Sequence, residues 1–331
     1  MEWFLGIIAA TVAFFSALFV GAEPIVYELP RPMIVEEKAE VLFGGDLFFD
    51  RAIRIAMEKH GPDYPLSCIA PTLQSADIVV ANLEGPITSS DSQSVGTKPE
   101  EMGHYTFTFP TSTVGVLFRH NIRLVNLGNN HIMNFGRDGL LETKALLDGG
   151  AIGYFGNPDA PESERVARVT THGVRFSFVN WSDWTPIGKP PASNGASELN
   201  PVAEQIRKEA ELGRVVVVYT HWGEEYVPAT ERMKRLAHDF VDAGAGLVVG
   251  SHPHIVQEHE VYKGAHIYYS LGNLLFDQYW EAAVREGLLL KVTFGREGVE
   301  TIEEIHTELR RDGTVCLLKS ASSTLQEAGV F

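Results

Sequence analysis

Cysteine is scarce in this sequence of 331 residues, which contains only Cys68 and Cys316. The two cysteines lie far apart and neither belongs to a CxxC pair, so a zinc site built on cysteine is excluded. In an oxidising compartment they could form a disulfide, but the sequence by itself favours two isolated buried thiols.

Basic residues are also few. Lysine and arginine number 27 against 43 aspartates and glutamates, which gives a formal net charge of -16. Because an acidic surface repels phosphate backbones, this composition argues against broad nucleic-acid binding and against a long groove for any polyanion. A bound metal could still hold an anion locally by supplying positive charge.

Charge is absent from residues 3–22, which read WFLGIIAATVAFFSALFVGA. A helix needs about 20 apolar residues to cross the core of a bilayer. Residues 1–22 are therefore either a membrane anchor or a signal peptide cut after Val20-Gly21-Ala22. The lack of a preceding Lys or Arg favours the hydrophobic anchor helix. Residues 23–38 contain three prolines among charges and are predicted to form a linker.

Beyond residue 38 the composition is that of a globular protein with a sizeable core, at 44% hydrophobic and 21% charged residues for the whole chain. Short β-branched runs bounded by glycine predict buried strands, and helical patterns fall between several of them. This alternation predicts an α/β domain over residues 39–295, and residues 296–331 are expected to be a C-terminal extension of the same domain.

Polar residues follow the predicted strands at six places. In open α/β sheets, ligands bind at the carboxyl ends of strands, so these side chains are expected to converge. They are Asp46, Glu84, Asn130, His131, His221, His252 and His254. Taken singly, each is more often a helix cap or a structural residue. His252 and His254 carry more weight, because a spacing of two on an extended segment points both rings to one side.

Six ordered blocks carry a resemblance to a known family. They are GGDLFFDR (44–51), NLEGPIT (82–88), NNHIMNFGRDGLLETKALL (129–147), HWGEEY (221–226), GSHPH (250–254) and YSLGNLLFDQ (269–278). The chain resembles the CapA/PgsA family of bacterial poly-γ-glutamate capsule synthesis over about residues 40–295. That family is similar to the calcineurin-like metallophosphoesterases.

The resemblance implies a four-layer α/β/β/α sandwich around a metal centre. It implies that one or two divalent transition metals (Mn, Zn or Fe) are held by oxygen and imidazole donors. The ligands would be Asp46, Glu84, Asn130, His221, His252 and His254. His131 would be the general acid for a leaving group.

Three positions depart from the pattern of such enzymes. Phe48 stands where an imidazole ligand is usual, so one ligand is missing. Glu84 replaces the usual bridging aspartate with a longer side chain. Asn134 occupies a position that is commonly Asp in the family, which puts the tuning of His131 in doubt.

Further residues could bind substrate or orient the ligands. Arg51 could contact an anionic substrate or lie on a helix surface. Glu224 and its neighbour Glu225 could orient histidines. Tyr269 and Asn273 belong to a family motif at the end of a predicted strand, and each could equally line the pocket or pack in the core.

These observations leave several functions open. One is capsule or poly-γ-glutamate-type polymer biosynthesis with a phosphoesterase-like hydrolase site. Another is a non-catalytic accessory subunit of a membrane polymer synthesis or export complex, and a third is a protein that grips a carboxylate through a metal. The expected partners are membrane-bound synthase or export subunits, with an anionic polymer or a phosphorylated envelope substrate. The domain would be extracytoplasmic and anchored, or secreted if residues 1–22 are cleaved.

Overall fold

The computed structural model describes residues 37–157, 165–184 and 199–318, without the side chains of residues 199 and 200. The predicted membrane segment 1–22 and most of the predicted linker 23–38 lie outside these ranges. Within the described ranges, no helix is both long enough and apolar enough to span a bilayer.

The first sheet is mixed and runs in the order β14-β13-β12-β1-β2-β3-β4, with β11 also paired to β1. Strands β1 to β4 and β11 run parallel to one another. Strand β12 is antiparallel to β1, β13 is antiparallel to β12, and β14 is antiparallel to β13. The bounds are β1 (Ala39–Leu47), β2 (Ile78–Leu83), β3 (Ile122–Asn126), β4 (Gly153–Phe155), β11 (Asn273–Leu275), β12 (Glu286–Gly295), β13 (Gly298–Leu309) and β14 (Val315–Leu317).

The second sheet runs in the order β5-β6-β7-β8-β10-β9, and its four central strands are parallel. Its bounds are β5 (Val166–Thr171), β6 (Val174–Ser182), β7 (Val215–His221), β8 (Leu247–Ser251), β9 (His259–Tyr262) and β10 (Ala265–Tyr268). The predicted α/β class is confirmed, because parallel strands of both sheets alternate with helices along the chain.

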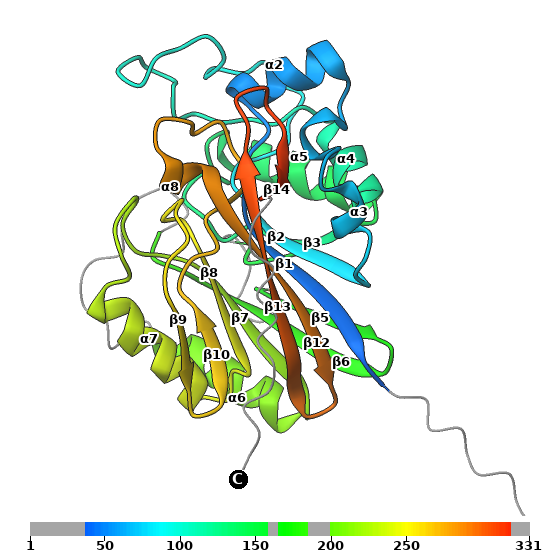
Figure 1. Ribbon diagram of the computed structural model, residues 1–331, viewed down its shortest axis with the longest axis vertical. Helices are drawn as coiled ribbons and strands as arrows, with labels where there is room; N and C mark the ends of the chain where they lie inside the picture. The colour runs from blue at the N-terminus through cyan, green and yellow to red at the C-terminus, as the bar shows by residue number, and fades with distance from the viewer. Residues whose placement is uncertain (1–36, 158–164, 185–198, 319–331) are drawn as a thin grey trace, which may run out of the picture. The chain divides into compact units, whose positions relative to one another are not determined.

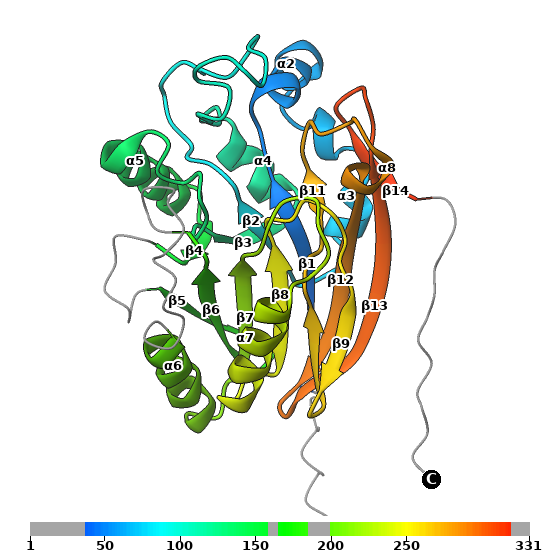
Figure 2. The same cartoon turned by 90° about the vertical axis from the view of Figure 1, so that its left-hand side faces the viewer.

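Helices lie on the outer sides of the two sheets (Figure 2). Residues of α4 and α5 share a core with the first sheet, and residues of α6 and α7 share another with the second. The helices are α2 (Arg51–His60), α3 (Ala70–Leu73), α4 (Thr113–Arg119), α5 (Gly136–Gly149), α6 (Leu199–Glu211), α7 (Glu231–Asp242) and α8 (Ala282–Arg285), with a short 3-10 turn η2 (Tyr64–Leu66).

A third core joins the two sheets to each other, and β7 shows how the sequence builds it. All seven residues of this strand are buried. Val217 and Tyr219 face the core between the sheets, whereas Val216 and Val218 face the helices. Because side chains alternate across a strand, a continuous apolar run is required wherever both faces of a sheet are covered.

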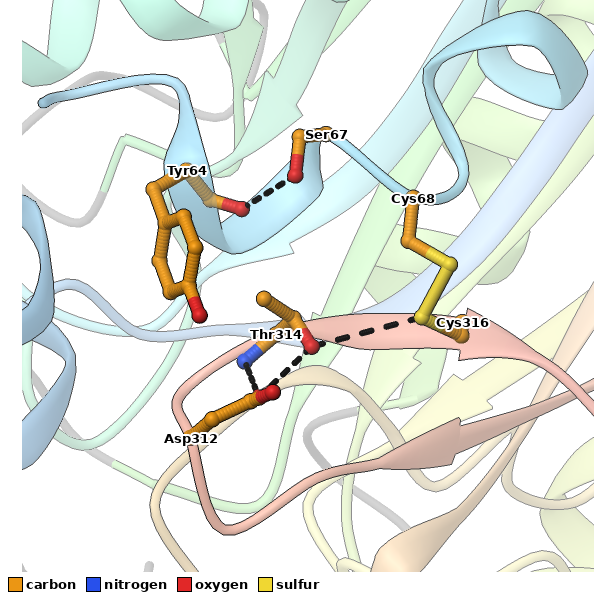
Figure 3. Close-up of a disulfide and its surroundings, with 6 residues drawn as sticks. All are labelled: Tyr64, Ser67, Cys68, Asp312, Thr314 and Cys316. Carbon is orange, nitrogen blue, oxygen red and sulfur yellow. Dashed lines mark hydrogen bonds between the residues drawn. A yellow bond between two sulfur atoms is a disulfide. The ribbon is translucent and has the colours of Figure 1, made fainter. Parts of the chain in front are cut away.

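Strands β13 and β14 come from the segment after residue 295 and complete the first sheet at one edge (Figure 1). Cys316 on β14 forms a disulfide with Cys68, which lies between η2 and α3 (Figure 3). The expectation of two isolated thiols is wrong. A separation of 248 residues says nothing about spatial distance, and the sheet brings the two Cα atoms to 5.1 Å.

Candidate metal centre

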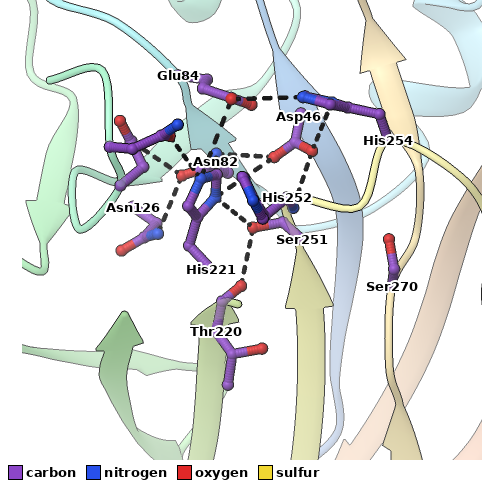
Figure 4. A network of polar contacts seen from close by, with 12 residues as sticks. Asp46, Asn82, Glu84, Asn126, Thr220, His221, Ser251, His252, His254 and Ser270 are labelled. Carbon is purple, nitrogen blue, oxygen red and sulfur yellow. Dashed lines mark hydrogen bonds and ion pairs between the residues drawn. The ribbon is translucent and has the colours of Figure 1, made fainter. Parts of the chain in front are cut away.

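The carboxyl ends of β1, β2, β7 and β8 meet at one edge of the two sheets, and polar side chains gather there (Figure 4). Asp46 lies near the end of β1, Glu84 directly follows β2, and His221 ends β7. His252 and His254 follow β8. The predicted convergence of these five residues is therefore seen in the structure, and all five are buried.

Asp46 is held by several donors although it is fully buried. Asn82 Nδ2 donates to its Oδ1 at 2.8 Å, and the backbone N–H of His252 donates to its Oδ2 at 3.1 Å. His254 Nδ1 lies 3.3 Å from Oδ2. Burial would raise the pKa of Asp46, but the contacts with His254, the charge of His221 and the Asn82 hydrogen bond lower it below its usual value.

Glu84 is equally buried but has no such support. Neither of its carboxylate oxygens has a hydrogen-bond partner. Its Oε1 lies 3.6 Å from His254 Nε2 and 4.0 Å from His221 Nε2. Burial and the charge of Asp46 raise the pKa of Glu84 well above its usual value. A buried carboxylate in these surroundings is stable only with a proton or a cation close by.

His252 and His254 do not lie on an extended segment, which corrects the reason given for their convergence. Both have a positive φ, of 96° and 57°, in the turn after β8. This backbone is costly for residues other than glycine and is typical of functional sites. His252 Nδ1 is buried without a partner, and burial together with the charge of His254 lowers the pKa of His252 to about 3. Its imidazole is therefore neutral and free to bind a metal.

His254 differs from its neighbour, because Asn273 Oδ1 lies 2.9 Å from its Nδ1. Burial would lower the pKa of His254, but the hydrogen bond to Asp46 and the charge of Asp46 raise it. Asn273 is itself buried and donates through Nδ2 to the carbonyl of Val284 at 3.0 Å. Asn273 therefore holds the His254 ring in its orientation through the contact at Nδ1.

Three overlapping groups of side chains could hold a metal ion. They are Asp46, Glu84 and His254; Glu84, His221 and His252; and Glu225, His252 and His254. Within each group, the ligand atoms lie within 4.8 Å of one another. Buried donors without partners on Glu84 and His252 are what a divalent cation would satisfy, so these residues fit a metal. Glu225 is exposed and belongs to one of these groups, although the sequence predicted only that it could orient histidines. Glu224 is also exposed and belongs to none of the three groups.

Asn130 and His131 follow β3 and face the same region. His221 Nε2 lies 2.8 Å from Asn130 Oδ1. Asn134 Oδ1 accepts a hydrogen bond from the backbone of Phe107 at 2.8 Å and faces His131 Nδ1 at 3.1 Å. Because this oxygen can only accept, His131 carries its proton on Nδ1. Burial lowers the pKa of His131 to about 4, which leaves the ring neutral at pH 7.

Phe48 occupies an aromatic cluster instead of joining the polar group. Its ring stacks on Phe276 at 4.3 Å and meets Phe107 edge-on at 4.8 Å. The side chain is fully buried. The position where an imidazole ligand is usual is therefore filled by an aromatic ring that packs against other aromatic rings.

A network of asparagines supports the centre and was not anticipated. Asn82 Oδ1 accepts hydrogen bonds from Asn126 Nδ2 at 3.0 Å and Asn129 Nδ2 at 3.1 Å. Asn180 Nδ2 on β6 donates to Asn126 Oδ1 at 3.0 Å, which links the two sheets. Asparagines at strand ends were visible in the sequence, but only pairing of distant strands makes them a network.

A cavity of about 620 Å³ opens beside the polar group. His131, Asn130, His254 and Arg51 line it. Arg51 Nε donates to Asp277 Oδ2 at 3.1 Å, and its Nη1 donates to His104 Nε2 at 2.9 Å. Arg51 therefore belongs to the cavity wall and not to an open helix surface.

Tyr269 lies elsewhere. Its ring stacks near Trp222 with centroids 6.0 Å apart, and its hydroxyl donates to Glu260 at 2.6 Å. The side chain is fully buried in the core between the second sheet and its helices. Of the two possibilities left open for this tyrosine, the structure places it in the core.

The two-sheet α/β fold and the buried carboxylates and imidazoles at the strand ends define an α/β protein with a candidate metal centre. A family described as "Bacterial capsule synthesis protein PGA_cap" matches residues 40–278. The chain therefore belongs to this family, and the resemblance to CapA/PgsA proteins is confirmed.

Three relatives illustrate the relationship. The chain is 31% identical to "Capsule biosynthesis protein CapA" of Bacillus anthracis over 74% of its own length and 61% of that protein. It is 30% identical to "PGA biosynthesis protein CapA" of Bacillus subtilis over 79% of itself and 69% of the relative. It is 28% identical to a "Probable polyglutamine synthesis accessory protein" of Mycobacterium tuberculosis over 61% and 56% of the two chains.

A solved structure supports the fold alone. A hypothetical protein from Thermus thermophilus has a TM-score of 0.51 and 17% sequence identity. The match covers 81% of this chain and 99% of that one.

Proposed function

We propose that this protein serves capsule or poly-γ-glutamate-type polymer biosynthesis through a metal-dependent, phosphoesterase-like hydrolase site. The fold would be the four-layer α/β/β/α sandwich of the metallophosphoesterases. One observation carries the proposal: Glu84 is a fully buried carboxylate without a hydrogen-bond partner, set among Asp46, His221, His252 and His254. Such a residue is costly to the fold in its ionised form unless a cation balances it.

Asp46, Glu84 and His254 would hold one ion, and Glu84, His221 and His252 a second. A bound Mn, Zn or Fe ion would supply a Lewis acid for a phosphoryl oxygen. Asn273 and Asn82 would keep His254 and Asp46 in place through their hydrogen bonds.

His131 is the residue we assign to proton transfer at the cavity. Asn134 fixes its tautomer, so Nε2 carries the lone pair. With a pKa of about 4, this ring accepts a hydrogen bond at neutral pH and donates a proton to a leaving group only after taking one up.

The disulfide between Cys68 and Cys316 supports an extracytoplasmic location, because such bonds persist in oxidising compartments. We propose that residues 1–22 anchor the chain, or are cleaved from a secreted form, and that membrane-bound synthase or export subunits are its partners. The substrate would be an anionic polymer or a phosphorylated envelope component.

The alternative is a non-catalytic accessory subunit of the same machinery. The apolar packing of Phe48, where an imidazole ligand would be expected, favours it. The chain spans 61% of the length of the Bacillus anthracis relative.

Metal content distinguishes the two. The full-length protein is purified without chelator and analysed by elemental mass spectrometry, beside His252→Ala/His254→Ala. The matched control is His259→Ala/His266→Ala, which removes two histidines that contact each other on β9 and β10.

One or two equivalents of metal in the wild type and the control, but not in His252→Ala/His254→Ala, would support the site. A screen of phosphoesters would then follow. A folded wild type without metal would overturn the enzyme proposal and leave the accessory role.

A further inference from the structure

A cavity of about 610 Å³ opens at the amino ends of strands in the second sheet. Val215 and Val216, which begin β7, line it, whereas His221 at the other end of that strand belongs to the candidate metal centre (Figure 2). The strand from Val215 to His221 separates the two sites by about 20 Å. This cavity is therefore distinct from the one beside the metal centre.

Three arginines line this cavity, although the chain has a formal net charge of -16. They are Arg175, Arg214 and Arg296, and the one carboxylate among the described residues of the wall is the exposed Glu297. Arg296 is neutralised by Glu37, which accepts hydrogen bonds from its Nε and Nη2. Arg175 and Arg214 therefore give the cavity its positive charge.

Arg175 and Arg214 begin side by side on neighbouring strands. Phe176 on β6 is paired with Val215 on β7, and each arginine directly precedes one member of this pair. Neighbouring strands lie about 4.8 Å apart, so the two side chains leave the backbone close together. Like charges at such a separation repel each other, and an anion bound near both would relieve the repulsion.

Glu209 lies beside Arg214 but does not neutralise it fully. Its Oε2 is 3.7 Å from Arg214 Nε, which is too long for a hydrogen bond. Arg168 already donates to both oxygens of Glu209, and Ser177 donates to Oε2 at 2.7 Å. Arg214 Nε is buried without a hydrogen-bond partner. One carboxylate is thus shared between two guanidinium groups, and the closer contacts belong to Arg168.

Most donors of the two guanidinium groups remain available. Each group has five N–H donors. Arg175 Nη2 donates to the carbonyl of Gly213 at 3.1 Å, and Arg214 Nη1 donates to that of Phe176 at 3.4 Å. These are the hydrogen bonds that the described residues give the two side chains, and neither acceptor carries a charge. An incoming carboxylate could therefore accept two parallel N–H groups from a guanidinium.

The size and the wall of the cavity favour an organic anion over a single inorganic ion. Pockets of roughly 300–1,000 Å³ hold drug-sized ligands. Much of the wall is glycine, where no side chain covers the backbone; these residues are Gly173, Gly213, Gly244, Gly246 and Gly298. The space therefore suits a short stretch of chain.

We propose that Arg175 and Arg214 form an anion subsite for a chain that carries one carboxylate on each unit. Two neighbouring guanidinium groups match carboxylates on successive units. The acidic remainder of the protein opposes a doubly charged phosphate or an anionic bilayer more strongly than it opposes single carboxylates. A poly-γ-glutamate-type polymer has this chemistry. That identification rests on the proposed function, but the subsite itself requires no metal, and it would hold the polymer away from the metal centre.

Calorimetric titration of the full-length protein tests the subsite. The ligands are a γ-linked glutamate tetramer, the same tetramer with every carboxylate amidated, and inorganic phosphate. Each is titrated before and after metal removal, with the chelator dialysed away because chelators are themselves polycarboxylates. Metal content is measured on the same samples. Co-sedimentation compares vesicles of phosphatidylglycerol with vesicles of phosphatidylcholine, because the apolar residues 1–22 favour both.

We expect the glutamate tetramer to bind after metal removal, with an affinity that falls as salt rises. The amidated tetramer and phosphate should bind at least about tenfold more weakly. Arg175→Gln should lower the affinity for the glutamate tetramer about tenfold, the size of one charge-assisted contact. Arg235→Gln removes the same charge from an exposed position on α7 that does not line the cavity, so it should bind like the wild type.

Absence of tetramer binding, binding that is lost with the metal, or equal binding of the amidated tetramer would overturn the subsite. So would an unchanged affinity in Arg175→Gln, or a preference for phosphate or for phosphatidylglycerol over phosphatidylcholine. The two tetramers are compared on the wild type, so this comparison is decisive even if Arg175→Gln fails to fold. Tetramer binding by a protein that never holds metal would overturn the proposed hydrolase and keep the subsite. Metal without tetramer binding would do the reverse.

Discussion

Glu84→Gln tests whether the buried carboxylate exists for a metal. The substitution keeps the shape of the side chain and removes its charge. Burial and the charge of Asp46 raise the pKa of Glu84, so its contribution to stability is favourable below its unfolded pKa and is lost as pH rises through the folded value. Each unit of that shift costs the metal-free protein about 1.4 kcal/mol once the group is ionised.

Metal-free Glu84→Gln should therefore be as stable as the wild type at pH 5 and equally or more stable at pH 8. With metal bound, the wild type should be more stable than Glu84→Gln. A ligand at a thousand times its Kd stabilises the wild type by about 4 kcal/mol. For a chain of this size that is a rise in Tm of about 8 °C, at about 2 °C per kcal/mol. Glu84→Gln should lose most of this rise.

The control is Glu209→Gln, because Glu209 is just as buried but is fully partnered. Arg168 Nε donates to it at 3.0 Å and Ser177 Oγ at 2.7 Å. Burial would raise the pKa of Glu209, but the hydrogen bonds and charge of Arg168 and the Ser177 hydrogen bond lower it. Glu209→Gln removes the negative charge that these donors balance, so its Tm should fall, and it should fall equally with and without metal.

The assay is thermal unfolding by calorimetry in chelator and in excess Mn or Zn. A metal-free Glu84→Gln protein that unfolds well below the wild type would refute the view that this carboxylate is uncompensated. Retention of the full metal-induced rise would refute its role as a ligand.

Three further predictions rest on the same contacts. Metal binding at pH 7 should release a proton from the carboxyl of Glu84, measured as a dependence of the calorimetric enthalpy on the ionisation enthalpy of the buffer. Cys68→Ser should destabilise the protein by about 2–5 kcal/mol in denaturant titrations, as should reduction of the wild type, and Cys68→Ser/Cys316→Ser should be no worse than either. Asn134→Asp keeps the acceptor beside His131 Nδ1 and adds a charge, so NMR titration should show a pKa above the present value of about 4, by about 1–3 units.

Much of the site could be predicted from sequence because its residues occupy strand ends. Asp46, Glu84 and His221 follow runs of apolar residues, and parallel strands place their carboxyl ends at the same edge. That reasoning needs only the local pattern and the topology. It says nothing about which of two neighbouring glutamates reaches the centre, and Glu225 rather than Glu224 forms a group with the histidines.

The sequence by itself determined the α/β class, the family and the set of oxygen and imidazole donors, because these depend on local periodicity and on ordered motifs. Only the tertiary structure decided which of those donors have no hydrogen-bond partner and which side chains surround them. The pairing of Cys68 with Cys316, the asparagines that join the two sheets, and the missing partners of Glu84 all depend on segments far apart in the chain. Burial and distance decide pKa and pairing, and neither is a property of neighbouring residues in sequence.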